Sequence, residues 1–365
     1  MELLNDLGGY QAAFGAEDIS SPAMKRAVGN WFDLYYDRAS LMQLPYTIVR
    51  KLVCGLFAEY SVSGTVLKHL PERNAMELAL IGGECYLKPV MLDGLWHWRA
   101  IPRGSILVFA RDWHGEPTDV GLMEKTRKGR FYYTLLERRK LDAGGLLTVT
   151  NRLFRSGDRG QLGREVKLSE QPLYKDLPQR YTYPMELGGV GLVRLKMPMA
   201  NCIDGSREGV SIYAAAMPLM AAIEENERLL QAEFRHGKSR LVVSRDMLRD
   251  GLLKDELFVG LDESPENVGI TCFAPQLRTQ SFLERQQSYL KLVENVIGLK
   301  RGILSQVEAV DRTATEVTSS EGEYACLLVD LRKCFESAAL ECAALAGRLD
   351  GCPEVAQISW GDGVI

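Results

Sequence analysis

The chain has 365 residues, a formal net charge of -4 and a sequence pI of about 5.8. Hydrophobic residues make up 46% and charged residues 25%, which is ordinary for a globular protein of two to three domains. A domain that grips nucleic acid along its surface usually has a pI above about 9. The acidic balance therefore excludes a broad electrostatic clamp on DNA or RNA.

The first 70 residues are predicted to form helices. Ser21 and Pro22 mark a helix start, because a capping hydroxyl precedes a proline at the first helical position. A second helix is expected from Pro45, since apolar residues recur every four positions from Ile48 to Tyr60. A third helical segment is expected from about Ser63 to Ile81, ending at a Gly-Gly pair.

A mostly β region is predicted from residue 84 to about residue 170. Glu84 to Met91 and Leu95 to Ile101 flank an Asp-Gly pair, which is a strong hairpin signal. Phe131 to Leu136 and Leu146 to Phe154 flank a Gly-Gly pair and indicate a second hairpin.

The second half of the chain returns to helical patterns. Gly205 to His236 is predicted to be a helix, with Pro218 either inside its first turns or marking its real start. Gly237 is a plausible C-cap, and Ser239 to Ser244 indicate a short strand.

Two further helices are expected downstream. In the first, Phe282, Gln286, Tyr289, Val293 and Val296 share one face. The second runs from about Thr315 to Leu349 and forms a rod of about 50 Å, since each residue adds about 1.5 Å. Its apolar stripe must be buried, either against the same chain or against a neighbouring subunit.

The cysteines and the apolar runs limit the kind of protein. No Cys-x-x-Cys pair occurs, which favours free thiols in a reducing cytoplasm over a structural zinc site. The N-terminus has no basic segment typical of a signal peptide. The longest apolar run, Tyr213 to Ile223, is too short to span a bilayer.

No local motif predicts an enzyme. Gly237-Lys238-Ser239 matches only the end of a phosphate-binding loop, because the required earlier glycine is Ala232. The motif also follows a helix rather than opening one, so a helix C-cap is the favoured interpretation. The four histidines are scattered, and His97 between two tryptophans is expected to be structural. We therefore expect no catalytic residues, no metal and no cofactor.

A basic stretch from Lys125 to Lys140 leaves two interpretations open. Phe131, Tyr132 and Tyr133 are interleaved among seven basic residues, which is compatible with a nucleic-acid patch. A solvated loop leading into a strand is favoured, because the aromatic residues alternate as strand residues do.

An ordered set of segments resembles the portal proteins (head–tail connectors) of long-tailed, siphophage-type double-stranded DNA phages. The resemblance covers nearly the whole chain. The segments that carry it are Trp31–Tyr36, Leu44–Leu56, Met197–Asn201, Gly209–Tyr213, Glu233–Arg240, Phe282–Leu299 and Asp311–Val317.

The resemblance implies an α+β portal fold with an α/β wing, a helical stem, a small α/β clip and a long wing helix. The expected crown is short or absent, because members of the family usually continue beyond the equivalent of residue 362. The implied regions are wing 1–204, stem helices 205–236 and 274–298, clip 237–273, tunnel loop 299–314, wing helix 315–349 and crown stub 350–365.

The resemblance also implies partners and site residues. The expected assembly is a ring, typically of twelve subunits, around a channel for double-stranded DNA, in the virion and earlier in the host cytoplasm. Its expected partners are the terminase large subunit, a head–tail adaptor, and the major capsid and scaffolding proteins, with no membrane. The implied tunnel-loop residues are Lys300, Arg301, Gly302, Ile303, Leu304, Ser305 and Arg312. The implied clip residues for terminase and adaptor docking are Ser239, Arg240, Arg245, Asp246, Arg249 and Asp250.

Two alternatives remain. A DNA-packaging enzyme such as a terminase subunit would need a complete phosphate-binding loop and an acidic metal cluster, and the sequence shows neither. The other alternative is a head–tail adaptor, or another head–tail connector in a domesticated phage-like particle such as a gene transfer agent.

Overall fold

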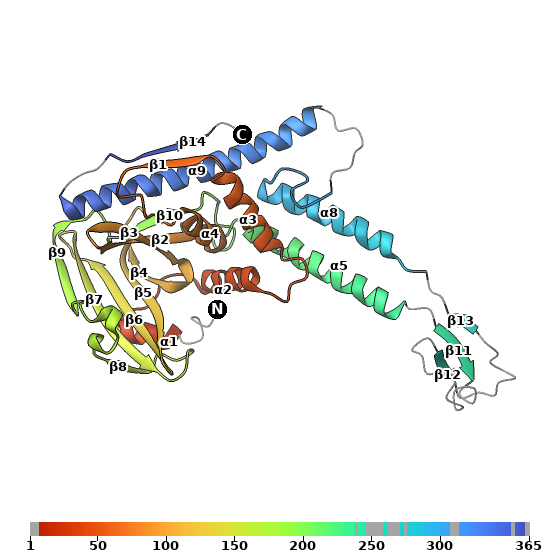
Figure 1. The fold of residues 1–365 in the computed structure, drawn as a ribbon, viewed down its shortest axis with the longest axis horizontal. Coiled ribbons are helices and arrows are strands. Elements are labelled where there is room, and N and C mark those ends of the chain that lie inside the picture. The colour runs from red at the N-terminus through yellow and green to blue at the C-terminus, as the bar shows by residue number, and fades with distance from the viewer. Residues whose placement is uncertain are drawn as a thin grey trace. The chain divides into compact units, whose positions relative to one another are not determined.

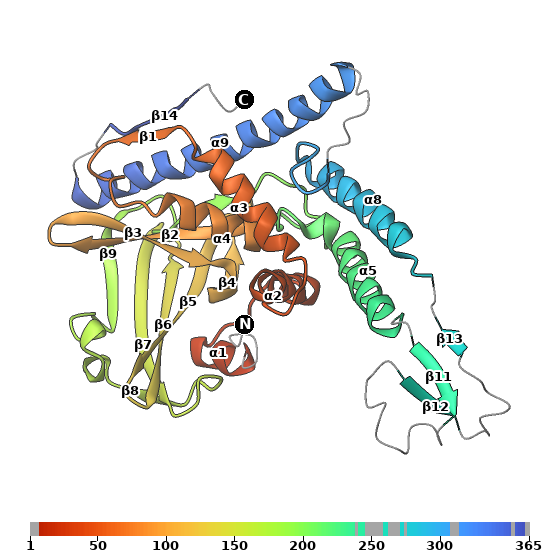
Figure 2. The same cartoon turned by 45° about the vertical axis from the view of Figure 1, so that its right-hand side comes forward.

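The computed structural model describes residues 7–237, 240–244, 258–261, 271–273, 276–306, 314–351 and 355–361. The chain divides into two compact units (Figures 1 and 2). Unit 1 comprises Met1–Ala39, Gln43–Ala215 and Glu321–Ile365, and unit 2 comprises Ser40–Met42 and Ala216–Ser320.

Unit 1 begins with the three helices α1 (Leu7–Phe14), α2 (Pro22–Tyr36) and α3 (Leu44–Leu56). The expected start of α2 is confirmed, because the Ser21 hydroxyl accepts a hydrogen bond of 3.1 Å from the Met24 amide. The predicted stripe of α3 is confirmed at Ile48, Leu52 and Leu56, which are fully buried, but its fourth member, Tyr60, lies beyond the end of the helix.

The third helix is shorter than expected. Tyr60–Ser63 form strand β1, and helix α4 covers only Glu72–Gly82. Pro71 immediately precedes α4, and proline disfavours helical backbone at the residue before it. At the other end the Gly-Gly stop is confirmed: Gly83 has a φ of 79°, and a Cβ there would collide with the backbone of Gly209.

A three-stranded sheet follows, in the order β10-β2-β3. The predicted hairpin is confirmed, with β2 (Glu84–Leu92) antiparallel to β3 (Leu95–Pro102). Asp93 and Gly94 form its turn with positive φ angles of 52° and 75°, as a two-residue hairpin requires. β10 (Val193–Lys196) pairs with the start of β2.

The larger sheet of unit 1 has six strands, and Figure 2 shows them side by side. The order is β4-β5-β6-β7-β8, and β9 also pairs with β7. The second predicted hairpin, β6 with β7, is confirmed and is longer than expected. The strands are β4 (Ile106–Arg111), β5 (Pro117–Lys128), β6 (Phe131–Leu141), β7 (Leu146–Ser156), β8 (Arg164–Val166) and β9 (Arg180–Glu186).

The loop expected within the basic stretch is a strand instead. Lys125 to Lys128 end β5 and pair with Thr134 to Phe131 of β6. The reason is that buried Val120 and Leu122 fix the register of β5 against β6 earlier in the strand. The pairing of the two strands then continues in that register to the turn at Gly129.

Each face of this sheet carries its own core. On one face, α1 packs Tyr10 and Phe14 against Leu107, Phe109 and residues of β5 to β7. On the other face, alternate residues such as Ile106, Val108 and Val120 pack with Tyr86 of β2. The alternation of side chains along each strand therefore fixes the sheet between α1 and the smaller sheet.

The predicted long helix is confirmed as α9 (Ala314–Asp350). Its apolar stripe is buried in unit 1 at Leu328, Leu331, Phe335, Cys342 and Leu345. Strand β14 (Gln357–Trp360), in the segment expected to be a crown stub, pairs antiparallel with β1 (Figure 1). The rings of Phe57, Tyr60, Phe335 and Trp360 pack together where β1, β14 and α9 meet.

Unit 2 contains two long helices, α5 (Met217–His236) and α8 (Thr279–Ile297), which lie side by side. The helix expected from Gly205 begins at Met217, because Pro218 occupies its first turn. The expected cap is confirmed: the Gly237 amide donates to the Glu233 carbonyl at 2.7 Å. On α8, Val293 is buried as expected, but Val296 is 46% exposed.

A small sheet in the order β12-β11-β13 completes the described part of unit 2. β11 (Arg240–Ser244) pairs parallel with β12 (Phe258–Leu261) and antiparallel with β13 (Thr271–Phe273). Within the described ranges, short 3-10 helices cover Arg103–Ser105, Leu168–Glu170, Pro172–Tyr174 and Ala214–Ala216. None of the helices in the described ranges is both long enough and apolar enough to cross a membrane.

Candidate functional site

The loop that follows α8 is organised by one buried carboxylate. Glu294, in the last turn of α8, is fully buried. Its Oε1 accepts hydrogen bonds from the backbone amides of Gly302 at 3.1 Å, Leu304 at 2.6 Å and Ser305 at 2.9 Å. Its Oε2 accepts a fourth bond from the Ser305 hydroxyl at 2.7 Å. The carboxylate therefore replaces a set of backbone partners that an irregular loop cannot supply itself.

The backbone at the end of α8 turns sharply into this loop. Gly298 has a φ of 81°, and its amide donates to the Glu294 carbonyl at 3.0 Å. The Leu299 amide donates to the same carbonyl at 2.8 Å. Further along, the Gln306 amide donates to the side chain of Gln287 at 2.8 Å. Residues 299–306 are thus folded back onto the last turns of α8.

Six of the seven expected tunnel-loop residues lie in this loop. Lys300 and Arg301 are exposed, and Ser305 is buried against Glu294. Gly302, Ile303 and Leu304 are half-buried. Arg312 lies outside the described residues. The loop therefore presents its two cations on the surface and keeps its small and apolar residues closer to α8.

The expected clip residues lie mostly outside the described ranges. Arg240 is the first residue of β11, and only its backbone is described. The others, which the described ranges do not include, are Ser239, Arg245, Asp246, Arg249 and Asp250.

Polar contacts join the two helices of unit 2. The Asn226 side chain of α5 donates to the Phe282 carbonyl of α8 at 3.0 Å. At the far end, Arg278 forms an exposed ion pair of 3.0 Å with Glu233. Glu224 of α5 also accepts hydrogen bonds from the segment Ser40–Met42, which fixes that segment on α5.

Unit 1 contains a buried cluster of charges that the sequence did not reveal. Glu84 is fully buried and forms ion pairs with Arg103 at 3.0 Å and Arg194 at 2.5 Å. Glu208 pairs with the same Arg103 at 3.3 Å and with Arg111 at 3.5 Å. Burial alone would raise the pKa of Glu84, but the three arginines outweigh it and lower the pKa to about 2.

A second buried charge group lies at one wall of a cavity of about 490 Å³. Glu137 pairs with Lys88 and with Arg139, and these two cations overcome the effect of burial and lower the pKa of Glu137 to about 2. Leu173 and Tyr181 line the same cavity and are more than 40% exposed.

The basic stretch is largely engaged in contacts within unit 1. Arg138 pairs with Asp119 at 2.7 Å, and Arg139 pairs with Glu137 at 2.6 Å. Lys125 and Lys128 each donate to a backbone carbonyl, at 2.7 and 3.1 Å. These contacts favour a structural role over a nucleic-acid patch.

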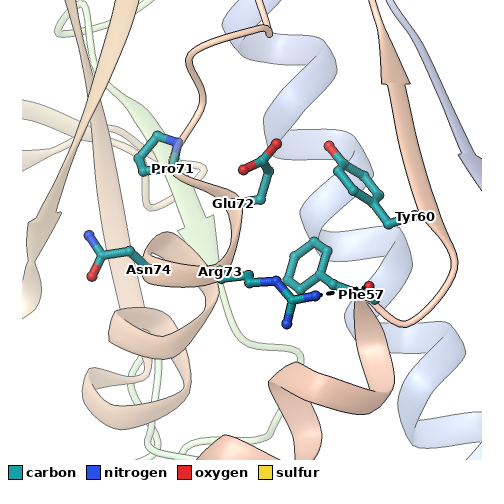
Figure 3. A pocket seen from close by; sticks show the side chains of 6 residues that line it. All are labelled: Phe57, Tyr60, Pro71, Glu72, Arg73 and Asn74. Atoms are coloured by element: carbon teal, nitrogen blue, oxygen red, sulfur yellow. Dashed lines mark hydrogen bonds between the residues drawn. The ribbon is translucent and has the colours of Figure 1, made fainter.

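A further cavity, of about 360 Å³, lies between α3, β1 and the start of α4. Figure 3 shows Arg73 reaching the Phe57 carbonyl, to which it donates at 3.1 Å. Burial raises the pKa of Glu72 and of Tyr60 in its wall.

The remaining candidate groups have structural explanations. His97 stacks on His69 with ring centroids 4.2 Å apart. Seven cysteines in the described ranges are free thiols, and within those ranges no three metal-ligating side chains converge.

The comparisons with known proteins give one finding about the fold. No protein-family model and no curated protein sequence matches the chain. Among solved structures, the chain is similar to a chain of the "Neck of native GTA particle computed with C12 symmetry", where GTA denotes a gene transfer agent. The match has 11% identity and a TM-score of 0.51, and covers 97% of this chain and 88% of that chain. The chain therefore has a mixed α+β fold shared with a neck protein of a phage-like particle.

Proposed function

We propose that the chain is a portal subunit, which assembles into a ring-shaped channel at one vertex of a capsid. Double-stranded DNA passes through this channel during packaging and ejection. The observation that carries the proposal is the fold similarity, over 97% of this chain, to a chain of a gene transfer agent neck computed with C12 symmetry. The ordered resemblance of seven segments to portal proteins supports it independently. A ring of twelve copies is the assembly this proposal favours.

Under this proposal, each described part of the chain corresponds to one region of a portal subunit. Unit 1 with α9 is the wing, and α5 with α8 is the stem. The small sheet β12-β11-β13 belongs to the clip, where the terminase large subunit docks first and a head–tail adaptor later. The loop 299–306 is the described part of the proposed tunnel loop, 299–314, which narrows the channel. The further proposed partners are the major capsid and scaffolding proteins. The ring lies at the portal vertex of the virion, and it is in the host cytoplasm during assembly.

The charges suit a conduit for moving DNA. Each phosphate that a protein neutralises adds affinity and salt dependence. Lys300 and Arg301 are exposed in the loop, and symmetry repeats each of them around the ring. With a net charge of -4, the chain as a whole opposes tight binding, so these two cations guide DNA without arresting it.

The proposed role is structural, without catalysis, cofactor or membrane. The position of the Gly-Lys-Ser sequence argues against nucleotide binding by a terminase-type enzyme. Gly237 caps the C-terminus of α5, where the helix dipole is negative and repels phosphate. A second candidate is another head–tail connector, which the similarity to a chain from the neck of a gene transfer agent particle also favours.

Charge reversal in the loop tests the proposal. In particles that carry Arg301→Glu, we expect shorter packaged DNA and poorer DNA retention than in wild-type particles. Lys175→Glu is the matched control, because Lys175 is also an exposed cation but lies on the surface of unit 1. Unchanged packaging and retention in Arg301→Glu particles would refute the role of the loop.

A separate assay distinguishes the enzyme alternative. The purified chain is expected to show no ATP hydrolysis above background, with or without DNA. Robust turnover that persists through further purification would defeat the portal proposal and favour a packaging enzyme.

A further inference from the structure

The two-stranded sheet of unit 1 buries little of its own surface. β1 and β14 pair with each other, and within the described ranges neither strand has another partner. The hydroxyls of Ser61 and Ser359 face each other at 2.6 Å across the pair. Every residue of both strands is exposed or half-buried. A two-stranded sheet is at best marginally stable by itself in water, so its stability depends on what it packs against.

The middle of this sheet packs loosely against α9. A cavity of about 400 Å³ lies there, and its wall includes Val62 of β1, Ile358 of β14, and Glu336 and Leu340 of α9. Leu340 remains 43% exposed in this wall. Apolar side chains that face open space lack the contacts which a packed core provides. The sheet is therefore held on α9 mainly at one end, where aromatic rings meet.

The closed position of β14 depends on one aromatic side chain. The ring of Trp360 lies 5.0 Å from that of Tyr60 and 6.1 Å from that of Phe335, measured between ring centroids. Next to it, the Gly361 amide donates to the Glu59 carbonyl at 2.7 Å. Aromatic pairs and a single backbone hydrogen bond each stabilise closure only modestly.

Closure also buries donors that have no acceptor. Arg332 of α9 is 7% exposed, and its guanidinium carbon lies 5.3 Å from the centroid of the Trp360 ring. No acceptor among the described residues reaches its Nε or Nη2, nor the Nε1 of Trp360 or the hydroxyl of Tyr60. A buried cation without an anionic partner costs more free energy than a cation–π contact returns. The closed form is therefore weakened at the same point where it is anchored.

We propose that β14 is a strap that opens from β1 and α9 while the rest of unit 1 stays folded. Opening gives the unmet donors of Arg332 and Trp360 access to water, and it gives up only a short strand pairing and one ring cluster. Segments with few buried contacts open at a small fraction of the free energy of global unfolding. Opening removes the described strand partner of β1 and uncovers Arg332. The open chain thus offers a strand edge and a cation that the closed form hides. The inference does not depend on ring assembly.

Hydrogen–deuterium exchange of the full chain in dilute urea tests whether the strap opens. The amides of β1 and β14 are expected to exchange at least about 100-fold faster than those of β6, a central strand of the larger sheet. Their exchange is expected to respond little to urea, because a local opening exposes little surface. Exchange of β14 at the rate of β6, with the same urea dependence, would overturn the proposal, because β14 would then open only when unit 1 unfolds.

Three variants test the cause that the proposal assigns to the weak closure. Arg332→Met keeps the length of the side chain but removes the charge, so it is expected to slow exchange in β14 by at least about tenfold. Trp360→Ala removes the anchor and is expected to accelerate it. Lys333→Met is the matched control, because Lys333 is an exposed cation at the next position of α9. Exchange in Arg332→Met that is faster than in the wild type, or equal to that in Lys333→Met, would overturn the role of the buried charge.

Discussion

Replacing Glu294 with alanine is expected to release the loop 299–306 from the end of α8. The substitution removes the acceptor of three backbone amides and one hydroxyl, at distances of 2.6 to 3.1 Å. A hydrogen bond to a charged group contributes about 1.5–3 kcal/mol. Four such bonds to one carboxylate are not additive, and the carboxylate itself is costly to bury.

We therefore expect Glu294→Ala to lower the free energy needed to open the loop by about 2–4 kcal/mol. At about 1.4 kcal/mol per factor of ten, amide exchange at Gly302, Leu304 and Ser305 is expected to accelerate by roughly 30- to 1,000-fold. Glu294→Gln keeps one acceptor oxygen and is expected to have a smaller effect, below about tenfold.

Hydrogen–deuterium exchange resolved to single amides measures this directly. Glu284→Ala is the matched control, since Glu284 is an exposed glutamate on the same helix that accepts only a side-chain bond from Gln280. Exchange in the loop that is equal for Glu294→Ala and Glu284→Ala would refute the reasoning, because the loop would then hold its shape without the carboxylate.

Two further predictions concern the stability of unit 1. The folded-state pKa of Glu84, about 2, lies below its usual value of 4.5, so its stabilising contribution is present above pH 4.5 and is lost as the pH falls toward 2. This difference between the usual and the folded-state pKa corresponds to roughly 3 kcal/mol in the free energy of unfolding. Urea unfolding is expected to show Glu84→Gln destabilised at pH 7 and less sensitive to acid than the wild type, and parallel pH dependences for the two proteins would contradict this. Gly83→Ala is expected to lower the free energy of unfolding by at least about 2 kcal/mol, because it combines a positive φ with a collision of the new Cβ against Gly209. Gly94→Ala, with a similar φ but open space, is expected to cost about 1 kcal/mol, and equal melting temperatures for the two variants would argue against the collision.

The elements that the sequence predicted well are those specified by neighbouring residues. The cap at Ser21, the Asp93-Gly94 turn and the buried stripe of α9 each depend on chemistry within a few positions. Such local signals identify an element without reference to the rest of the fold.

The elements that the sequence missed depend on distant partners. β1 gains its strand conformation from β14, about 300 residues later, so the local pattern alone suggested a longer helix. The basic residues of β5 and β6 resembled a solvated loop because their counterions, such as Asp119 and Glu137, could not be assigned before the sheet register was known.

The candidate loop was located from the sequence, but its organisation was not. The break after α8 and its two cations follow from the residues themselves and from the portal resemblance. The role of Glu294 could not be inferred, because its position on α8 looks like that of any polar helix residue until the chain folds back over it. The charge cluster around Glu84 was missed for the same reason, since Arg194 is 110 residues away.

The most direct test of the central claim is electron microscopy of the purified full chain over a range of concentrations. The portal proposal predicts closed rings with a central hole, and class averages with twelvefold symmetry. Discrete monomers or open filaments at every concentration would contradict it.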